Sequence, residues 1–405
     1  MGFLNSAKLL NIIACFSILM FNFWNHSFQF LTPMIYCHCL LGSIIMAVCV
    51  EDLRLSDPGI YIRYGDDGML ETVITAPYQI ETRDVPIPQI KSGEVLVRMK
   101  RAGICGSDIQ VYHGLHKYME YPLVQGHEGT GYVVEVGADV RGLEVGDLVV
   151  MQPQFACGEC FACKKGRENV CESLKHYGIS VPGLYAEYVA VPEWNAVKMP
   201  RELDPECSVF VEPFSIACNA MYQGRVKAGD RVVVIGAGQI GNFVAQAAKL
   251  FGAEVLIADM IQSKLDLARS HGIHHCINIK EEPLKDAIHR VFGTKGVHVI
   301  FECAAVESSF TQAIECATKS SSIVVVGGFK KPYLLEIPLL QRREVSLHGV
   351  MGTSRATFLQ SADFISRNQV DLTGAISARF PLKNLAKAYE YIDQVGNTMK
   401  VLLEI

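Results

Sequence analysis

The sequence predicts a two-domain α/β protein, in which a β-rich domain is joined to a doubly wound parallel sheet. Residues 69–214 contain short alternating runs such as EVLVRM and GYVVEV, separated by turn residues, which is typical of half-buried strands. From Arg231 onward, wholly apolar runs such as RVVVIG alternate with helical stretches such as NFVAQAAKLFG. This alternation indicates βαβ units around a sheet that is buried on both faces. The chain has 405 residues, which is enough for two domains.

The domain limits follow from where these patterns begin and end. We place the β-rich domain at residues 69–214 and the parallel sheet at residues 215–350. Near Met351 the sheet pattern stops, a helical stretch ATFLQSADFISRN follows, and the chain closes with KVLLEI. We expect residues 351–405 to return to the first domain and to complete it.

The first 68 residues do not fit this organisation. No Asp, Glu, Lys or Arg occurs between Lys8 and Glu51, and the 23 residues from 28 to 50 are enough for a transmembrane helix. Three interpretations are open: a membrane anchor or hairpin, a targeting peptide, or an upstream stretch included by an early start assignment. We favour the third, because the sequence that opens at Met69 reads as a natural start with its own first strands.

Charge and cysteine content exclude some classes of function. The net charge of −5 argues against a general nucleic-acid binder, because neutralising phosphates requires a basic face. Four of the 14 cysteines lie between Cys157 and Cys171, which favours metal ligation over a disulfide framework. Thiolate sites belong to a reducing compartment. We therefore expect a cytoplasmic protein, with membrane association through residues 1–68 as the alternative.

A glycine motif predicts a dinucleotide site. Gly236, Gly238 and Gly241 follow an apolar strand and open a helix, so they permit a tight turn, close approach of a pyrophosphate and helix packing. The helix N-terminus adds partial positive charge for the phosphates. Asp259 ends the next strand, where its carboxylate would accept hydrogen bonds from the adenosine ribose and repel a 2′-phosphate, which favours NAD over NADP. We include Lys264, further along the chain, among the candidate cofactor-binding residues.

Two groups of residues have the chemistry of zinc ligands. One loop carries four closely spaced cysteines, which predict a closed structural site: Cys157, Cys160, Cys163 and Cys171. A second group comes from separate segments, with Cys105 in GICGSD, His127 and Glu128 in GHE, and Glu212 in VEPF. A thiolate, an imidazole and a carboxylate form an open catalytic zinc site when water keeps one position.

In their order along the chain, these motifs resemble the zinc-containing medium-chain dehydrogenases of the alcohol dehydrogenase superfamily. The resemblance covers Met69 to Ile405, and GHE followed later by VEP is similar to the sorbitol dehydrogenase branch of polyol, sugar and sugar-acid dehydrogenases. Threonine 3-dehydrogenase is a close relative. The resemblance implies a GroES-like catalytic domain, a Rossmann NAD-binding domain, a cleft between them and a homodimer or homotetramer.

The resemblance also implies roles for individual residues. It gives the catalytic zinc ligands as Cys105, His127 and Glu128. It implies that Glu212 binds the zinc-held water or, transiently, the metal, that Ser107 starts the proton relay, and that Asp108 supports the ligand histidine. Many relatives carry a histidine where this chain has Gln110, and this departure leaves the proton exit route open.

We therefore predict an enzyme that transfers a hydride between NAD and the secondary hydroxyl of a small polyol, sugar or sugar acid, with one catalytic and one structural zinc. An enzyme similar to L-threonine 3-dehydrogenase is the alternative. A zinc-free quinone or enoyl reductase is disfavoured by Cys105 and His127. A binding protein that kept the fold without turnover would be indicated by a missing ligand, and none is missing.

Overall fold

The computed structural model describes residues 68–116 and 119–405. Apart from Gly68, the N-terminal extension at residues 1–68 lies outside the described residues, so its three interpretations stay predictions. Within the described ranges, no helix is both long and apolar enough to cross a membrane.

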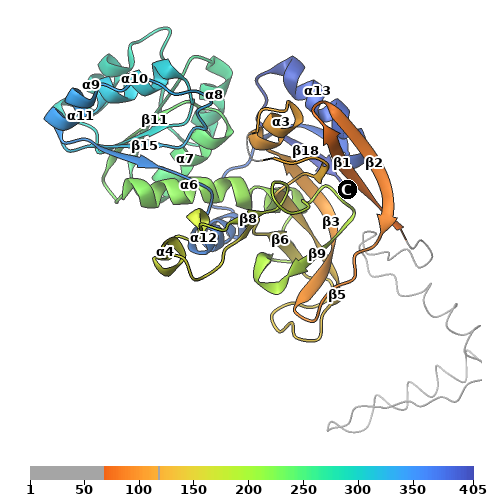
Figure 1. Ribbon diagram of the computed structural model, residues 1–405. Helices are drawn as coiled ribbons and strands as arrows, with labels where there is room; N and C mark the ends of the chain where they lie inside the picture. Colours follow the sequence, from red (N-terminus) through yellow and green to blue (C-terminus); the bar gives the residue numbers. More distant parts are fainter. Residues whose placement is uncertain (1–67, 117–118) are drawn as a thin grey trace, which may run out of the picture. The chain divides into compact units, whose positions relative to one another are not determined.

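The β-rich part contains two main sheets (Figure 1). A three-stranded sheet has the order β2-β1-β4, made of β1 (Gly68–Ala76), β2 (Gln79–Pro86) and β4 (Leu123–Val124). A seven-stranded sheet has the order β10-β6-β5-β3-β18-β17, and β9 also pairs with β3. Its strands are β3 (Glu94–Ile104), β5 (Glu128–Val136), β6 (Leu148–Met151), β9 (Tyr188–Pro192), β10 (Ala196–Lys198), β17 (Ile376–Pro381) and β18 (Lys400–Glu404).

The end of the chain pairs with the strand that leads into the first predicted metal ligand. β18 is antiparallel to β3, with Val401 opposite Ile104 and Leu403 opposite Ala102. These apolar residues are buried. β3 ends at Ile104, one residue before Cys105, and the pairing places Lys400 next to this end of the strand.

The second half forms a six-stranded parallel sheet with the order β13-β12-β11-β14-β15-β16. Its strands are β11 (Arg231–Ile235), β12 (Glu254–Asp259), β13 (His275–Asn278), β14 (Val299–Glu302), β15 (Ser322–Val325) and β16 (Ser346–Gly349). Successive residues of β11 face opposite sides: Val232 and Val234 belong to one core cluster, and Val233 and Ile235 to another. A strand covered on both faces must be apolar at every position, which explains the run RVVVIG.

Helices cover both faces of this sheet (Figure 1). The first cluster includes residues of α6 (Val211–Gly224), α7 (Gln239–Leu250) and α12 (Arg355–Ser366). The second includes residues of α9 (Leu284–Phe292) and α10 (Glu307–Cys316). The predicted combination of a β-rich part and a doubly wound parallel sheet is confirmed.

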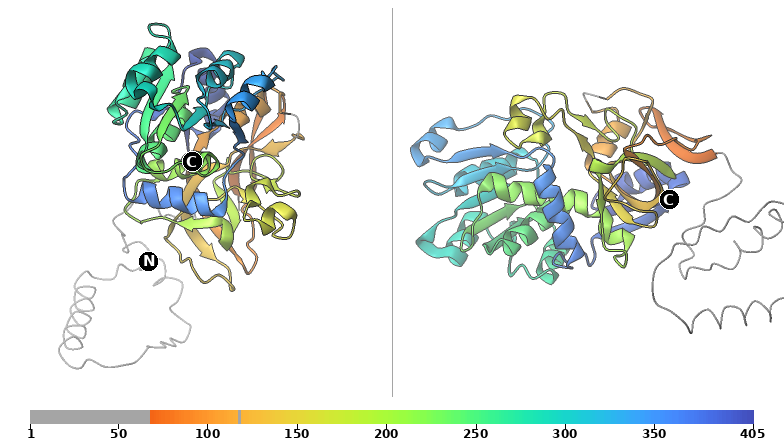
Figure 2. Two further views of the ribbon diagram at one scale, coloured as in Figure 1. Left: turned by 90° about the vertical axis from the view of Figure 1, so that its left-hand side faces the viewer. Right: turned by 90° about the horizontal axis from the view of Figure 1, so that it is seen from below.

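One helix precedes the parallel sheet in the sequence and another follows it, and these two helices pack together. α6 comes before the first parallel strand and α12 after the last, and Figure 2 shows them side by side. Ser361 of α12 donates a hydrogen bond to the carbonyl of Val211 in α6 at 2.6 Å. The limit that we placed between residues 214 and 215 falls inside α6, and the domain limits stay our proposal.

Candidate metal and dinucleotide sites

Three predicted ligands meet where β3 and β5 pair. One ligand atom from each of Cys105, His127 and Glu128 lies within 4.8 Å of the other two. Cys105 follows β3 and caps α3 (Gly106–Tyr112), whereas Glu128 begins β5 opposite Gly103. His127 and Glu128 are buried. A thiolate, an imidazole and a carboxylate are the donors that zinc takes in catalytic sites, so the group fits this metal. We call it the catalytic trio.

Asp108 lies beside the trio and is itself buried. Its Oδ2 accepts hydrogen bonds from the backbone N–H of Cys105 at 2.9 Å and from the Tyr185 hydroxyl at 3.0 Å. Its Oδ1 lies 3.6 Å from Nδ1 of His127. Burial raises the pKa of Asp108, but the charge of His127 and the hydrogen bonds outweigh it, so the pKa stays below its usual value. An ionised Asp108 favours the tautomer of His127 that carries its proton on Nδ1, and this tautomer leaves Nε2 available to bind a metal.

Lys400 is a residue of this site that the sequence did not reveal. It is 5% exposed, and its Nζ lies 2.7 Å from Oε1 and 2.6 Å from Oε2 of Glu128. Burial lowers the pKa of Lys400, but Glu128 and Cys105 outweigh it and the pKa is raised, so the ammonium group stays charged. A lysine at the start of an apolar strand suggests an exposed strand end, and only the pairing of β18 with β3 reveals the contact.

Glu212 lies in the first turn of α6 and is buried. It does not belong to the group whose ligand atoms lie within 4.8 Å of one another. Burial raises the pKa of Glu212 to about 7, with Glu128 raising it further and His127 and Lys400 opposing. The carboxyl group is therefore close enough to the trio for its pKa to respond to the charges there.

The other predicted residues of the proton route lie on α3. Ser107 is in its first turn, and Gln110 is one turn further along; both are half-buried. No hydrogen bond between these two side chains and the trio is present in the described part of the chain. Ser107 therefore lies in the first turn of the helix that Cys105 caps, and its part in the proton route stays a prediction.

His176 is a second residue near the trio that the sequence did not reveal. Its ring centroid lies 5.2 Å from that of His127, edge to face. Its Nδ1 lies 2.7 Å from the carbonyl of Tyr177, which can only accept, so Nδ1 carries the proton and Nε2 is left as an acceptor. Burial, followed by the charge of His127, lowers the pKa of His176 to about 4. No motif surrounds this histidine, so only its position in space indicates a role.

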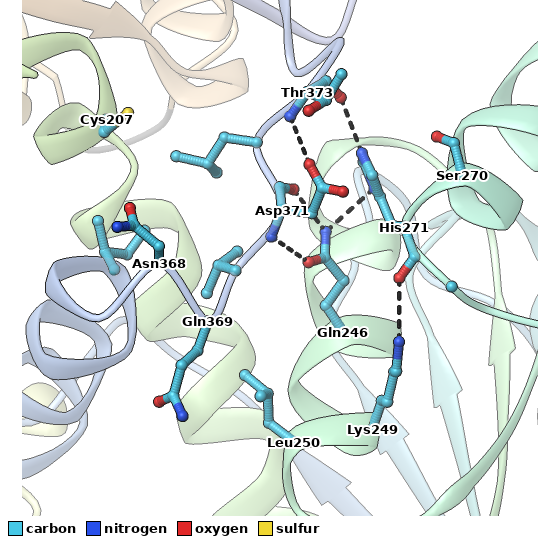
Figure 3. A pocket seen from close by; sticks show the side chains of 14 residues that line it. Cys207, Gln246, Lys249, Leu250, Ser270, His271, Asn368, Gln369, Asp371 and Thr373 are labelled. Atoms are coloured by element: carbon cyan, nitrogen blue, oxygen red, sulfur yellow. Dashed lines mark hydrogen bonds between the residues drawn. The ribbon is translucent and has the colours of Figure 1, made fainter.

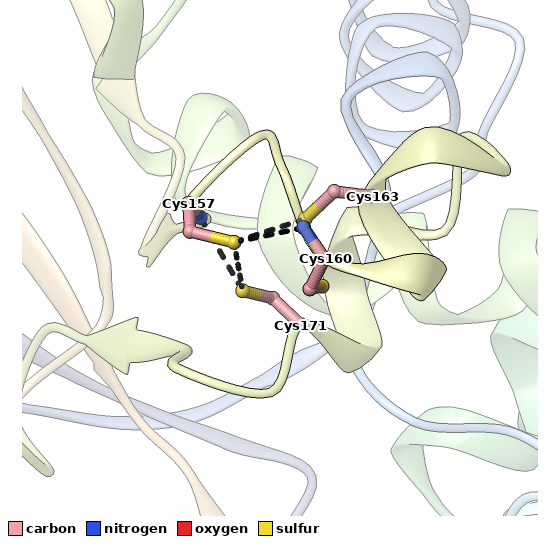
Figure 4. A group of neighbouring side chains, drawn as sticks. All are labelled: Cys157, Cys160, Cys163 and Cys171. Carbon is pink, nitrogen blue, oxygen red and sulfur yellow. Dashed lines mark hydrogen bonds between the residues drawn. The ribbon is translucent and has the colours of Figure 1, made fainter.

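The four cysteines of the second group lie together on one loop (Figure 4). The Sγ of Cys157 lies 3.4 Å from that of Cys171 and 3.9 Å from that of Cys163. The backbone N–H groups of Glu159 and Cys160 donate to the Sγ of Cys157, each at 3.4 Å, and lower its pKa to about 6. Four convergent thiols are the donor set of a closed zinc site, so the group fits a structural zinc.

The glycine motif has the predicted strand–turn–helix context. Gly236 follows β11 with φ +100°, which a side chain would strain, and Gly238 caps α7. A Cβ on Gly241 would collide with the carbonyl oxygen of Gly236. Asp259 ends β12, where its Oδ2 accepts from the Ala237 N–H at 2.6 Å and its Oδ1 from the Ile261 N–H at 2.9 Å. Each carboxylate oxygen keeps a further lone pair for a ribose hydroxyl.

Two further residues flank this loop. Lys264 lies in the first turn of α8 (Gln262–Ser270) and is half-buried, without a hydrogen bond of its side chain in the described part of the chain. Glu302, which the sequence did not single out, is fully buried at the end of β14. Its Oε1 accepts from the N–H groups of Ala304 and Ala305, each at 2.9 Å, and from the Ser309 hydroxyl at 2.6 Å. It therefore shapes the turn that packs against Gly236.

Comparisons with known proteins agree with this geometry. Residues 91–201 match the family model of the alcohol dehydrogenase GroES-like domain, and residues 240–367 match that of the zinc-binding dehydrogenases. The chain is 32% identical over 315 residues to 2-dehydro-3-deoxy-L-galactonate 5-dehydrogenase of Pseudoalteromonas atlantica, covering 78% of this chain and 92% of the relative. It is 28% identical over 332 residues to the sorbitol dehydrogenase of Bacillus subtilis, covering 80% and 94%.

A third relative has a different substrate in its name. L-threonine 3-dehydrogenase of Yersinia pestis is 28% identical over 324 residues, covering 79% of this chain and 94% of the relative.

Solved structures have the same fold. An Escherichia coli CFT073 alcohol dehydrogenase complexed with NADH superposes with a TM-score of 0.77 at 30% identity, covering 84% of this chain and all of that one. Galactitol-1-phosphate dehydrogenase from Escherichia coli gives a TM-score of 0.77 at 28% identity, covering 83% and 100%.

Proposed function

Because the chain belongs to the zinc-containing medium-chain dehydrogenases of the alcohol dehydrogenase superfamily, we propose that it oxidises the secondary hydroxyl of a polyol, sugar or sugar acid, with NAD as the acceptor. The observation that carries the proposal is the convergence of Cys105, His127 and Glu128. Relatives named for polyols and sugar acids support this substrate class. The complete trio argues against a binding protein that has lost turnover.

The residues of the trio would hold the catalytic zinc, and the four-cysteine group would hold the structural one. Bound zinc supplies a Lewis acid that lowers the pKa of a hydroxyl group, and NAD supplies the hydride acceptor. Asp108, whose Oδ1 lies 3.6 Å from Nδ1 of His127, would favour a proton on Nδ1 and so leave Nε2 for the metal. Lys400 balances the charge of Glu128 and keeps its carboxylate in place.

Two groups of this chain would handle the proton released by the substrate. Ser107 follows Cys105 by two residues and would accept it first, as the family resemblance implies. Glu212 offers a carboxylate whose pKa of about 7 suits proton exchange near neutral pH. His176 adds an Nε2 acceptor that would receive a hydrogen bond from a substrate hydroxyl. These roles are proposals for individual residues, and each can be tested by substitution.

The cofactor would lie along the glycine motif. The N-terminus of α7 would face the pyrophosphate, and Asp259 would bind the adenosine ribose. Lys264, in the first turn of the next helix, would approach the same end of the cofactor. We further propose a homodimer or homotetramer in a reducing, cytoplasmic environment, which sedimentation of the full chain and cell fractionation can test.

A substrate panel tests the proposed function. The zinc-loaded protein is assayed for NAD reduction with hexitols, sugar acids and L-threonine, with Cys105→Ser as the matched inactive variant. We expect the highest kcat/KM for a polyol or sugar acid and no turnover by Cys105→Ser. Preference for L-threonine would favour the second candidate, which the Yersinia relative supports. Absence of turnover on the entire panel would contradict the proposal.

A further inference from the structure

A cavity of about 360 Å³ lies between the four-cysteine loop and the helices α6 and α12. Gly166 and Arg167 of that loop, Asn219 and Gln223 of α6, and Ala356 and Thr357 of α12 contribute to its wall. None of the catalytic trio, the glycine motif or Asp259 lines it. The cavity is therefore separate from the residues to which we assign zinc and NAD.

The side chains of this cavity include two cationic arginines. Arg167, Arg225 and His348 line it, and no acidic residue does. Neither arginine forms an ion pair with a carboxylate in the described part of the chain. The Arg167 guanidinium donates to the Gln223 carboxamide oxygen at 2.6 Å, once the carboxamide has the orientation that hydrogen bonding requires. Arg225 is exposed just after the end of α6. Two guanidinium groups without counter-charges make the cavity attractive to an anion.

The N-terminus of α12 gives an independent indication of the same chemistry. The N–H of Arg355 donates to Oε1 of Glu168 at 2.6 Å, and the N–H of Thr357 donates to the Ser354 hydroxyl at 3.3 Å. The N–H of Ala356, between them, has no partner among the described residues, and Ala356 lines the cavity. A helix of 12 residues places partial positive charge at this end, although Glu168 offsets part of it.

A larger cavity of the molecule provides a contrast (Figure 3). It has a volume of about 730 Å³ and also contains polar side chains. There, however, the groups satisfy one another: Gln246 bonds both the N–H and the carbonyl of Asp371, and His271 Nε2 donates to the carbonyl of Thr373 at 2.8 Å. The smaller cavity differs because no carboxylate lines it, so the charges of Arg167 and Arg225 are not balanced there.

We propose that the smaller cavity binds a phosphate monoester of a polyol or sugar, at a site distinct from the catalytic one. Arg167 and Arg225 would contact the phosphate oxygens, for which planar guanidinium groups are suited. The N–H of Ala356 would donate to the same group. The amide nitrogen of Gln223, whose carboxamide oxygen accepts from Arg167, would donate to a hydroxyl of the ligand. A volume of about 360 Å³ accommodates a ligand of this size.

Calorimetry on the full chain, loaded with zinc and saturated with NADH, tests the proposal. The probes are a hexitol 1-phosphate, the unphosphorylated hexitol and inorganic phosphate. We expect the ester to bind more tightly than either of the others. Arg167→Gln and Arg225→Gln should each weaken its binding at least tenfold, or about 1.4 kcal/mol. The control is Arg342→Gln, which changes an exposed arginine of α11 (Ile337–Arg343) and should leave binding unchanged.

A second control separates this cavity from the catalytic site. Cys105→Ser should leave binding of the ester unchanged, because the trio does not line the cavity. Binding that Cys105→Ser abolishes and both arginine variants retain would overturn the proposal. So would equal affinity for the ester and inorganic phosphate, or absence of saturable binding. If Arg167→Gln disturbs the neighbouring cysteine loop, Arg225→Gln provides the test, since Arg225 is exposed.

Discussion

Lys400, on the last strand of the chain, forms a buried ion pair with Glu128, its Nζ lying 2.7 Å from Oε1 and 2.6 Å from Oε2. The side chains are 6% and 1% exposed. The pair exists because β18 returns to β3, next to the end of that strand. A proposed metal ligand is thus balanced by a residue 272 positions away in the chain. Removing one partner of such a pair leaves an uncompensated buried charge.

The first prediction follows from this pair. Lys400→Met should destabilise the zinc-free protein by about 3 kcal/mol, because Glu128 then remains buried without its counter-charge. The loss should be smaller in the zinc-loaded protein, since the metal supplies positive charge in place of the ammonium group. Urea unfolding of both forms measures the two differences. The matched control is Lys91→Met, which breaks an ion pair with Glu94 whose lysine is 85% exposed. An equal loss with and without zinc would contradict the proposed contact between Glu128 and the metal.

The second prediction concerns cofactor choice. Asp259→Ser removes the carboxylate that we assign to the adenosine ribose, so the ratio of kcat/KM for NAD to that for NADP should fall at least tenfold, or about 1.4 kcal/mol. Steady-state kinetics with both cofactors measures the ratio. Asp266→Asn, on the exposed face of α8, is the control and should leave the ratio unchanged. If the unaltered protein prefers NADP, the role of Asp259 is wrong.

The third prediction concerns the four-cysteine loop. Cys160→Ser should lower Tm by roughly 10 °C, because the structural zinc contributes several kcal/mol of folding free energy. Cys276→Ser changes a half-buried cysteine that lies outside the four-cysteine group and packs against the first core cluster, and it should have a smaller effect. Calorimetric melting of both variants measures the difference. Similar melting temperatures would mean that the loop does not depend on a metal.

The fourth prediction concerns acid stability. Asp147 is fully buried, with Lys198 at 2.8 Å and Arg201 at 3.1 Å. Burial raises the pKa of Asp147, but these hydrogen bonds outweigh it and hold the pKa below its usual value of 3.8. A depressed pKa in the folded state stabilises the protein above the unfolded pKa, and this contribution is lost as the pH falls through the folded one.

Asp147→Asn tests this contribution. The variant should be less stable than the unaltered protein by about 1–2 kcal/mol at neutral pH, since both cationic partners are partly exposed. The difference should shrink as the pH falls below about 4. Urea unfolding across this pH range measures it. A difference that does not depend on pH would assign the effect to shape rather than to charge.

Much of the fold could be predicted because short patterns in the sequence, such as apolar runs and the spacing of cysteines and glycines, indicate it. The all-apolar run RVVVIG requires cover on both faces, and the two core clusters provide it. The four cysteines lie within one loop, so their spacing alone predicts that they converge. The backbone at Gly236 has a positive φ angle, and the backbone at Gly241 leaves no space for a Cβ atom. Both positions therefore require glycine, and the glycines mark the turn in the sequence.

The sequence analysis did not identify Lys400, His176 or Glu302. The roles of these residues depend on how the chain folds rather than on a local motif. Lys400 reaches Glu128 only through the register of β18 on β3, and no local motif encodes that register. His176 lies beside His127 because the chain folds back after the cysteine loop. Glu302 is a single acidic residue at the end of an apolar strand, where an exposed strand end is the simplest interpretation, yet it is fully buried.

Zinc stoichiometry combined with turnover tests the central claim most directly. Elemental analysis of the unaltered protein and of Cys105→Ser is run beside the NAD-reduction assay. The expected result is two zinc ions per chain in the unaltered protein, one for each group of ligands, and one in Cys105→Ser, with turnover lost but the fold retained. An unaltered chain with a single zinc, or a Cys105→Ser variant that keeps its turnover, would contradict it.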